Sequence, residues 1–256
     1  MKLYGIYFSP TGGTKKVLDI LMNEWKIDTE LVDLTQPQFK IKKVFDRNDI
    51  CMIAIPSYGG RVPEIVIERL ANIKGDHIRV ILIVVYGNRD YDDTLLELKN
   101  TVKDHGFNPI AAITAVARHS IMNQFASDRP NAIDQMELQV FSREIKNLVD
   151  IKEKYQELKV PGNYPYRKYS GVPFKPKGNR LCNRCGICAK SCPLQAIPSN
   201  DPKQVDKSKC ISCMRCVKVC PNQARQVNLL LLKAAGKLMA KKCSLRKENQ
   251  LFFEME

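Results

Sequence analysis

The chain has 256 residues, of which 44% are hydrophobic and 27% charged, enough apolar material for a packed core. This composition excludes wholesale disorder. No apolar run approaches the roughly 18 residues of a membrane-spanning helix. The apolar stretch after Met1–Lys2 is too short for a signal peptide, so we expect a cytoplasmic protein with no transmembrane segment.

Charge and cysteine are distributed unevenly along the chain. Residues 1–160 carry 22 basic and 22 acidic side chains, whereas residues 161–256 carry 19 basic and 5 acidic ones. The formal net charge of +14 therefore lies entirely in the C-terminal part, which also holds nine of the ten cysteines. This asymmetry predicts separate modules with different partners.

The first 160 residues alternate between β-rich runs and helical patterns. Strands are predicted at residues 3–8, 30–34, 50–56, 78–85 and 109–116. Helices are predicted up to about Trp25, after Pro63, over residues 94–105 and beyond Pro130. Because parallel strands need helical crossovers, the pattern predicts an α/β fold with an open, doubly wound sheet of five parallel strands.

A change of composition marks the next boundary. Residues 161–178 are rich in proline, glycine and aromatic side chains, which predicts a linker that packs along the surface. We therefore divide the chain into an α/β domain (1–160), this linker (161–178), a small cysteine-rich domain (179–226) and a basic C-terminal helix or tail (227–256). Residues 229–242 form a basic amphipathic pattern whose four adjacent leucines we expect to pack on the protein, with attachment to a membrane surface as the alternative.

The cysteine-rich domain repeats one motif without a gap. Each copy reads Cys-x-x-Cys-x-x-Cys-x-x-x-Cys-Pro, and the pattern is the bacterial iron–sulfur run in which the fourth cysteine of each copy binds the other cluster. On that rule one [4Fe–4S] cluster is bound by Cys182, Cys185, Cys188 and Cys220, and the other by Cys210, Cys213, Cys216 and Cys192.

Zinc knuckles and disulfides are the alternatives for these cysteines. Zinc sites use pairs of Cys-x-x-Cys rather than triple runs with a trailing Cys-Pro, and disulfides do not suit a cytosolic chain. Two metal clusters, standing in for a core that has few large apolar residues, remain the prediction. Residues 178–226 closely resemble the bacterial-type dicluster ferredoxins, a resemblance that implies one-electron transfer at low potential.

The loop after the first predicted strand has the composition of a phosphate site. Residues 9–14 read Ser-Pro-Thr-Gly-Gly-Thr and precede a helix, so backbone N–H groups and hydroxyls gather at a helix N-terminus. The loop matches neither a Walker A motif nor the dinucleotide fingerprint, and an ordinary helix cap is the alternative.

Two further loops are expected beside it, because parallel strands end at one edge of the sheet, where such sheets bind ligands. Residues 56–63 (PSYGGRVP) follow the third strand and residues 86–91 (YGNRDY) follow the fourth. Both offer aromatic side chains and glycine backbone to a flat ring.

On these loops residues 1–160 resemble the flavodoxins, and the whole chain resembles a family of fused flavodoxin–ferredoxin electron carriers of anaerobic bacteria and archaea. The resemblance implies FMN as cofactor and the strand order 2-1-3-4-5. It places the phosphate on the first loop and the ring between the other two. The residues it implies are Ser9, Thr11, Gly12, Gly13 and Thr14 for the phosphate, and Pro56, Ser57, Tyr58, Gly59, Gly60, Tyr86, Gly87, Asn88 and Tyr91 around the ring.

Three other side chains bear on this site. Arg61 and Arg89 lie in the ring loops, where residues 90, 92 and 93, all aspartates, partly offset them. The two arginines predict a less negative potential for the fully reduced flavin than in a stand-alone flavodoxin. His119 follows the fifth strand and is either a flavin contact or proton-handling group or an ordinary loop histidine.

The predicted function is electron transfer, with electrons relayed between two [4Fe–4S] clusters and FMN so that one-electron carriers are coupled to two-electron flavin chemistry. An FMN-dependent reductase of a small substrate or dioxygen is the enzymatic alternative. A binding module, in which the basic tail holds nucleic acid or membrane, is the other. Part of the positive charge is accounted for by anionic cofactors, so nucleic acid is not the expected partner. We expect an acidic redox protein instead, and a homodimer stays open.

Overall fold

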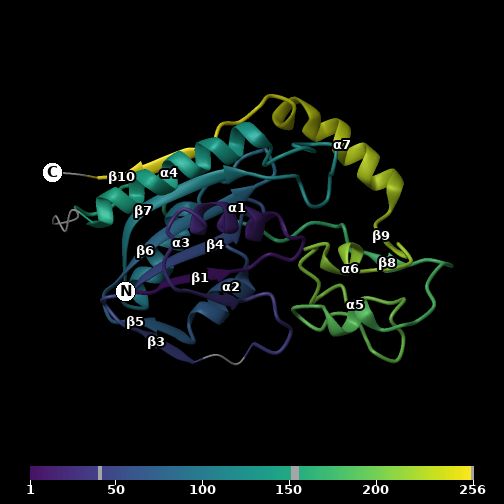
Figure 1. Ribbon diagram of the computed structural model, residues 1–256. Helices are drawn as coiled ribbons and strands as arrows, with labels where there is room; N and C mark the ends of the chain where they lie inside the picture. The colour runs from purple at the N-terminus through teal and green to yellow at the C-terminus, as the bar shows by residue number, and fades with distance from the viewer. Residues whose placement is uncertain (40–41, 151–155, 255–256) are drawn as a thin grey trace.

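A six-stranded sheet forms the centre of the computed structural model, which describes residues 1–39, 42–150 and 156–254 (Figure 1). Its strands are β1 (Leu3–Tyr7), β2 (Thr29–Asp33), β4 (Ile50–Pro56), β6 (Ile78–Tyr86), β7 (Phe107–Val116) and β10 (Gln250–Phe253). Their spatial order is β10-β7-β6-β4-β1-β2. The first five in chain order are parallel and follow the predicted order 2-1-3-4-5.

The sixth strand corrects the prediction of a five-stranded sheet. β10 pairs antiparallel with β7, with Phe252 opposite Ala112. It has only four residues and its partner lies more than a hundred residues earlier in the chain, so no local pattern indicated it.

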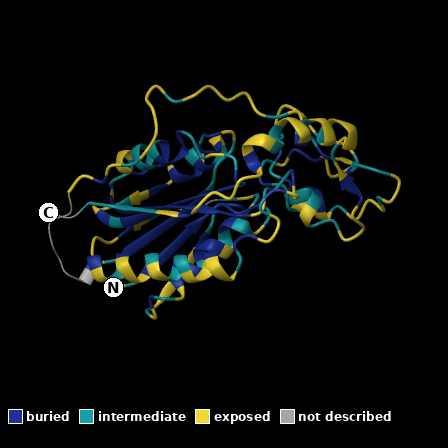
Figure 2. Cartoon of the chain, turned by 90° about the horizontal axis from the view of Figure 1, so that it is seen from above, coloured by how far each residue is buried: buried dark blue, intermediate teal, exposed yellow. Residues whose placement is uncertain are grey.

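The central strands are buried on both faces because helices cover the two sides of the sheet (Figure 2). Along β4, Cys51, Ile53 and Ile55 face one apolar cluster, while Met52 and Ala54 face the other. This alternation inside a continuous apolar run is typical of a parallel strand that is covered on both faces.

Four helices provide those covers. α1 (Gly13–Met22) and α4 (Ala132–Asp150) pack on one face, where the indole N–H of Trp25 donates to Ser142 Oγ at 3.0 Å. α2 (Glu64–Leu70) and α3 (Thr94–Asp104) pack on the other. All four helices lie where the periodicity predicted them.

The remaining elements are short. β3 (Lys43–Phe45) and β5 (Ile73–Gly75) form a small parallel pair, which the sequence analysis did not predict. In the cysteine-rich segment, β8 (Lys177–Gly178) pairs with β9 (Arg225–Gln226) around α5 (Ile187–Lys190) and α6 (Arg215–Lys218). This segment lies at one end of the sheet (Figure 1).

Beyond β9, α7 (Leu229–Cys243) crosses back over the cysteine-rich segment and leads to β10 (Figure 1). The return is fastened by a buried ion pair between Arg129 and Asp134, to which Arg246 and Asn249 are also hydrogen-bonded. The chain therefore leaves the sheet before the cysteine motifs and rejoins it after them.

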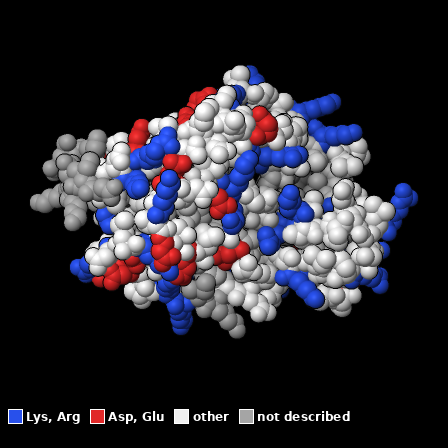
Figure 3. All heavy atoms as spheres, viewed as in Figure 1, with Lys and Arg blue, Asp and Glu red and all other residues white. Residues whose placement is uncertain are grey.

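The helix α7 was predicted correctly, but its leucines are not covered as expected. Leu229, Leu230 and Leu231 are 57%, 79% and 40% exposed, and only Leu232 joins an apolar cluster. Lys and Arg side chains project from this end of the molecule on the face shown in Figure 3, while acidic side chains gather over the sheet. Among the described residues, no helix has both the length and the apolar character needed to cross a membrane.

Candidate functional site

A cavity of about 560 Å³ opens at the carboxyl edge of the parallel strands. This volume lies within the range of about 300–1,000 Å³ typical of small-molecule sites. Four strand ends contribute to its wall. The residues are Pro10, Thr11, Gly13 and Thr14 after β1, Pro56, Ser57, Tyr58 and Gly59 at the end of β4, Tyr86, Gly87 and Arg89 at the end of β6, and Ala117 to Met122 after β7. The cavity therefore lies where the crossover direction of the sheet reverses, at the switch point that α/β sheets use for ligands.

The first loop carries groups that can bind an anion at a helix N-terminus. Gly12 adopts a left-handed conformation (φ 95°) at the N-cap of α1, which a glycine accepts without strain. The hydroxyl of Ser9 accepts the Lys15 N–H at 2.9 Å and so fixes the turn from inside, without lining the cavity. The first N–H groups of a helix have no intrahelical partner, and those of Gly13 and Thr14 belong to residues that line the cavity.

The linker forms a second wall, over the loop that follows β4. A side chain at Gly59 would meet the ring of Tyr169 at 2.3 Å, so the glycine allows this aromatic ring to lie directly on the backbone. Val172 and Phe174 continue the same wall. The predicted surface-packed linker thus contributes side chains to the site.

A buried carboxylate fastens this linker. Asp93 is 3% exposed and accepts the backbone N–H groups of Asn163 at 2.8 Å and of Arg167 at 2.7 Å. Burial alone would raise the pKa of Asp93, but these donors outweigh it and hold the pKa below its usual value. The carboxylate is therefore ionised in its working state and anchors the linker from below.

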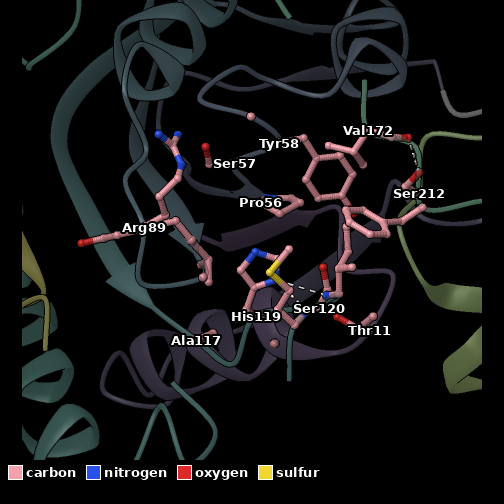
Figure 4. A pocket seen from close by; sticks show the side chains of 18 of the residues that line it. Thr11, Pro56, Ser57, Tyr58, Arg89, Ala117, His119, Ser120, Val172 and Ser212 are labelled. Carbon is pink, nitrogen blue, oxygen red and sulfur yellow. Dashed lines mark hydrogen bonds between the residues drawn. The ribbon is translucent and has the colours of Figure 1, made fainter. Parts of the chain in front are cut away.

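His119 lies in the cavity wall as a neutral ring (Figure 4). Burial and the neighbouring charge of Arg89 lower its pKa to about 4. Its Nδ1 accepts the N–H groups of Ile121 at 3.1 Å and Met122 at 3.2 Å, so the proton of the neutral ring is on Nε2. His119 can offer one N–H donor to a ligand but does not act as an acid near neutral pH.

Several residues expected around the ring serve the frame instead of the wall. The Asn88 amide donates to the carbonyl groups of Cys243 at 2.6 Å and Leu245 at 2.9 Å, which ties the end of α7 to the sheet. Tyr91 packs behind Tyr86, with ring centroids 5.3 Å apart, and its hydroxyl donates to Gln250 in β10. Gly12 and Gly60 lie next to the wall without lining the cavity.

The expected role of Arg61 is corrected by its partners. Its guanidinium makes two hydrogen bonds to the carboxylate of Glu97, at 2.8 and 2.6 Å, and donates to the Arg167 carbonyl at 2.7 Å. It does not line the cavity, so its charge is compensated away from the ring. Arg89 does line the cavity, but it is paired with Asp92. The predicted partial offset by aspartates is therefore found at Arg89, whereas Arg61 is paired with Glu97 and lies outside the cavity wall.

Two further parts of the wall gave no signal in the sequence. Ile211 and Ser212, between two cysteines of the second motif, line the cavity, and so do residues of α7. Figure 4 places Tyr58 toward Val172 and Ser212, on the side from which the cysteine-rich segment approaches. Burial raises the pKa of Tyr58 well above its usual value, and the thiols of Cys213 and Cys210 lie close enough to add to the effect.

The eight motif cysteines surround two small hollows. The outer hollow is lined by Cys182, Cys185, Cys188 and Cys220. The inner hollow is lined by Cys192, Cys210, Cys213 and Cys216. Each hollow receives three cysteines from one motif and the fourth from the other, the exchange that the spacing rule requires.

Within the described chain, no three His, Cys, Asp or Glu side chains converge as ligands of a single metal ion would. A [4Fe–4S] cube makes a different demand, because each of four thiolates binds a separate iron at its own corner. Four cysteines spaced around one hollow fit that demand.

The inner hollow and the cavity share a wall. Ile211 lines both, and Cys210 and Cys213 flank the pair Ile211–Ser212 that faces the cavity. Arg215 of α6 donates to the Pro10 carbonyl of the first loop at 3.3 Å. Arg69 of α2 donates to the carbonyl of Pro193, beside Cys192, at 2.8 Å. The cysteine-rich segment is therefore docked directly on the edge of the sheet that carries the cavity.

Comparison with known families matches residues 180–195 and 203–226 to 4Fe–4S binding domains. The strand order and the position of the cavity are those of the flavodoxin-like fold. The chain combines a flavodoxin-like sheet with two 4Fe–4S binding domains. These features support a redox protein with iron–sulfur and flavin chemistry.

No curated protein matches the chain. Among solved structures, a flavodoxin from Streptococcus pneumoniae TIGR4 is 15% identical, covers 58% of this chain and 99% of its own, and has a TM-score of 0.42. The two-electron reduced flavodoxin of Megasphaera elsdenii is 18% identical, covers 56% and 98%, and has a TM-score of 0.37. A flavodoxin from the domain Archaea is 11% identical, covers 59% and 99%, and has a TM-score of 0.40.

Proposed function

We propose that this protein relays electrons between two [4Fe–4S] clusters and FMN. The observation that supports the relay is the shared wall: Ile211 lines both the inner hollow and the sheet-edge cavity. A cluster in the inner hollow and a ring in the cavity would be neighbours within one chain. No dimer is needed to bring them together.

The cavity offers FMN two different ends. The phosphate would lie on the loop of Thr11, Gly13 and Thr14, where N–H groups and hydroxyls replace its water shell. The ring would lie toward Tyr58 and Tyr86, with backbone at Gly59 and Gly87 near its polar edge. When bound, FMN would take up two electrons in all, whereas each cluster passes one at a time.

The cysteines would hold the clusters as the two hollows divide them, with Cys182, Cys185, Cys188 and Cys220 around the outer one and Cys192, Cys210, Cys213 and Cys216 around the inner one. The inner cluster would then be the one that exchanges electrons with the flavin. The outer cluster would face the partner.

The outer hollow also favours a particular kind of partner. Cys185 is exposed, and the surrounding Arg180, Arg184 and Lys190 are exposed cations. An acidic redox protein would be steered to this surface by charge complementarity, most strongly at low ionic strength. Electrons would enter or leave there, and the flavin would lie at the other end of the path.

Residues of the cavity wall would provide a hydrogen-bond donor and an aromatic cover for the flavin ring. The Nε2–H of neutral His119 can donate one hydrogen bond to the ring, and its charge does not change near neutral pH. Tyr169 and Phe174 of the linker exclude water from one side. A site closed on this side favours transfer to the docked cluster over leakage of electrons to solvent species.

Anaerobic purification followed by metal, sulfide and flavin analysis tests the proposal. We expect about eight iron and eight sulfide ions and about one FMN per chain. After rapid mixing with a one-electron reductant, the cluster absorbance should bleach before the flavin band. Zinc in place of iron, absence of flavin, or flavin reduction that is unaffected by removal of the iron would contradict it.

A further inference from the structure

The two cysteine motifs differ at one buried position that the repeat makes comparable. The first ends Cys192-Pro-Leu-Gln-Ala-Ile197 and the second ends Cys220-Pro-Asn-Gln-Ala-Arg225. Ile197 is 4% exposed, as expected for a core residue, and Arg225 is 2% exposed. A guanidinium thus occupies the place in the second motif that an isoleucine fills in the first.

Arg225 has no carboxylate partner among the described ion pairs. Its Nη1 donates to the carbonyl groups of Pro202 at 2.6 Å and Gln204 at 3.1 Å, and its Nη2 donates to that of Pro176. Neutral carbonyl groups satisfy its donors there but do not cancel its charge. A buried cation without an anion is costly, so such an arrangement calls for one.

The Nε–H group of Arg225 is also left without a partner. Among all described residues, Arg225 Nε is the only buried side-chain nitrogen or oxygen with no hydrogen-bond partner. Buried polar atoms in native proteins nearly always have a partner, and an exception points to a group that binds there.

The guanidinium lies between the two hollows. Arg225 lines the outer hollow itself, and so does Pro202, whose carbonyl group accepts from its Nη1. Pro176, whose carbonyl group accepts from its Nη2, lines the inner hollow. A cation at this position therefore lines the outer site and is hydrogen-bonded to the wall of the inner one.

We propose that Arg225 is the counter-cation of the two clusters and that its unpartnered Nε–H donates to sulfur of the cluster in the outer hollow. This inference rests on the proposed function. Positive charge and hydrogen bonds to cluster sulfur stabilise the reduced, more negative state and so raise the reduction potential. Because Arg225 lines the outer hollow and not the inner one, the outer cluster gains more than the inner one.

The test is a potentiometric titration of both clusters, followed by electron paramagnetic resonance, in Arg225→Gln and Arg225→Lys variants of the full chain. Gln keeps a hydrogen-bond donor without the charge, whereas Lys keeps the charge without the planar fork. Lys207→Met, which removes one exposed cation from the same segment, is the matched control. Iron and sulfide counts establish that each variant is loaded.

In Arg225→Gln we expect the outer cluster to lose at least tenfold in its equilibrium for reduction, equivalent to 59 mV for one electron. The inner cluster should lose less, Arg225→Lys should stay close to wild type, and Lys207→Met should change by less than twofold. Unchanged potentials in Arg225→Gln, or an equal fall in the Gln and Lys variants, would overturn the inference while leaving the relay intact. A wild-type protein without clusters would instead overturn the proposed function.

Discussion

Replacing Asp93 with alanine should release the linker from the cavity and weaken flavin binding. The carboxylate accepts two backbone N–H groups and the side-chain amide of Asn163, at 2.7–3.2 Å. It makes no capping hydrogen bond to α3, so its removal leaves that helix capped as before. The substitution therefore acts on the linker and the wall that Tyr169 and Phe174 form.

The size of the effect follows from these contacts. A hydrogen bond to a charged acceptor contributes about 1.5–3 kcal/mol. Once the linker is free, a ligand must order it again on binding. If the binding free energy for FMN falls by the contribution of about one such hydrogen bond, the Kd for FMN rises about 10–100-fold.

Fluorescence titration of flavin-free protein with FMN measures this change. The control is Asp104→Ala, which removes an exposed carboxylate from the other end of α3. Cluster content should be the same in both variants, because Asp93 contacts neither hollow. The reasoning fails if Asp93→Ala binds FMN within threefold of the control, or if its iron content falls as much as its flavin affinity.

Three further predictions concern the clusters, the cavity and the frame. Cys192 lines the inner hollow, which adjoins the cavity, and Cys220 lines the outer one. Cys192→Ser should therefore slow flavin reduction more than Cys220→Ser. Equal slowing of both variants in stopped-flow experiments would contradict the shared wall. A proton resonance titration of His119 should give a pKa of about 4, so flavin affinity should show no step between about pH 6 and 8; a midpoint near 6.5 would place the ring in water. Against the effect of burial, the hydrogen bonds and charge of Arg129 lower the pKa of Asp134 from 3.8 to about 2. This shift corresponds to a stabilisation on the order of 2 kcal/mol that is present above about pH 4 and lost as the pH falls toward 2. Asp134→Asn should therefore reduce the free energy of unfolding at pH 7 by about 2–3 kcal/mol in denaturant titrations. The exposed control Asp128→Asn should reduce it by less than about 0.5 kcal/mol. Similar losses in both variants would argue against the buried ion pair.

Much of the fold could be read from local patterns. The five parallel strands and the helices between them follow from apolar runs and periodicity, because each burial pattern is written within a few neighbouring residues. The two hollows likewise follow from cysteine spacing, because the motif rule assigns three cysteines of one run and the fourth of the other to each site. The strand β10 escaped because its pairing depends on a partner far away in the chain.

The cavity was harder to predict in full. The strand-end residues were accessible from the rule that parallel strands share one edge, but Tyr169, Ile211 and the α7 residues line it only through tertiary docking. Arg61 shows the opposite limit: its place in a ring loop was correct, yet Glu97, 36 residues later, takes its charge away from the ring. Arg225 could have been noticed by aligning the two motifs, where it replaces the isoleucine of the first copy.

The strand β10 has a consequence for how the molecule can be taken apart. Because the polypeptide returns to β7 after the iron–sulfur motifs, those motifs are an insertion within the sheet domain and not an appendage at its end. Cutting the gene after residue 160 would strip the domain of its outermost strand and bare the backbone of β7, an open edge that invites aggregation. A circularly permuted or internally deleted version that splices β10 back to the sheet is the version of the flavin half to express alone.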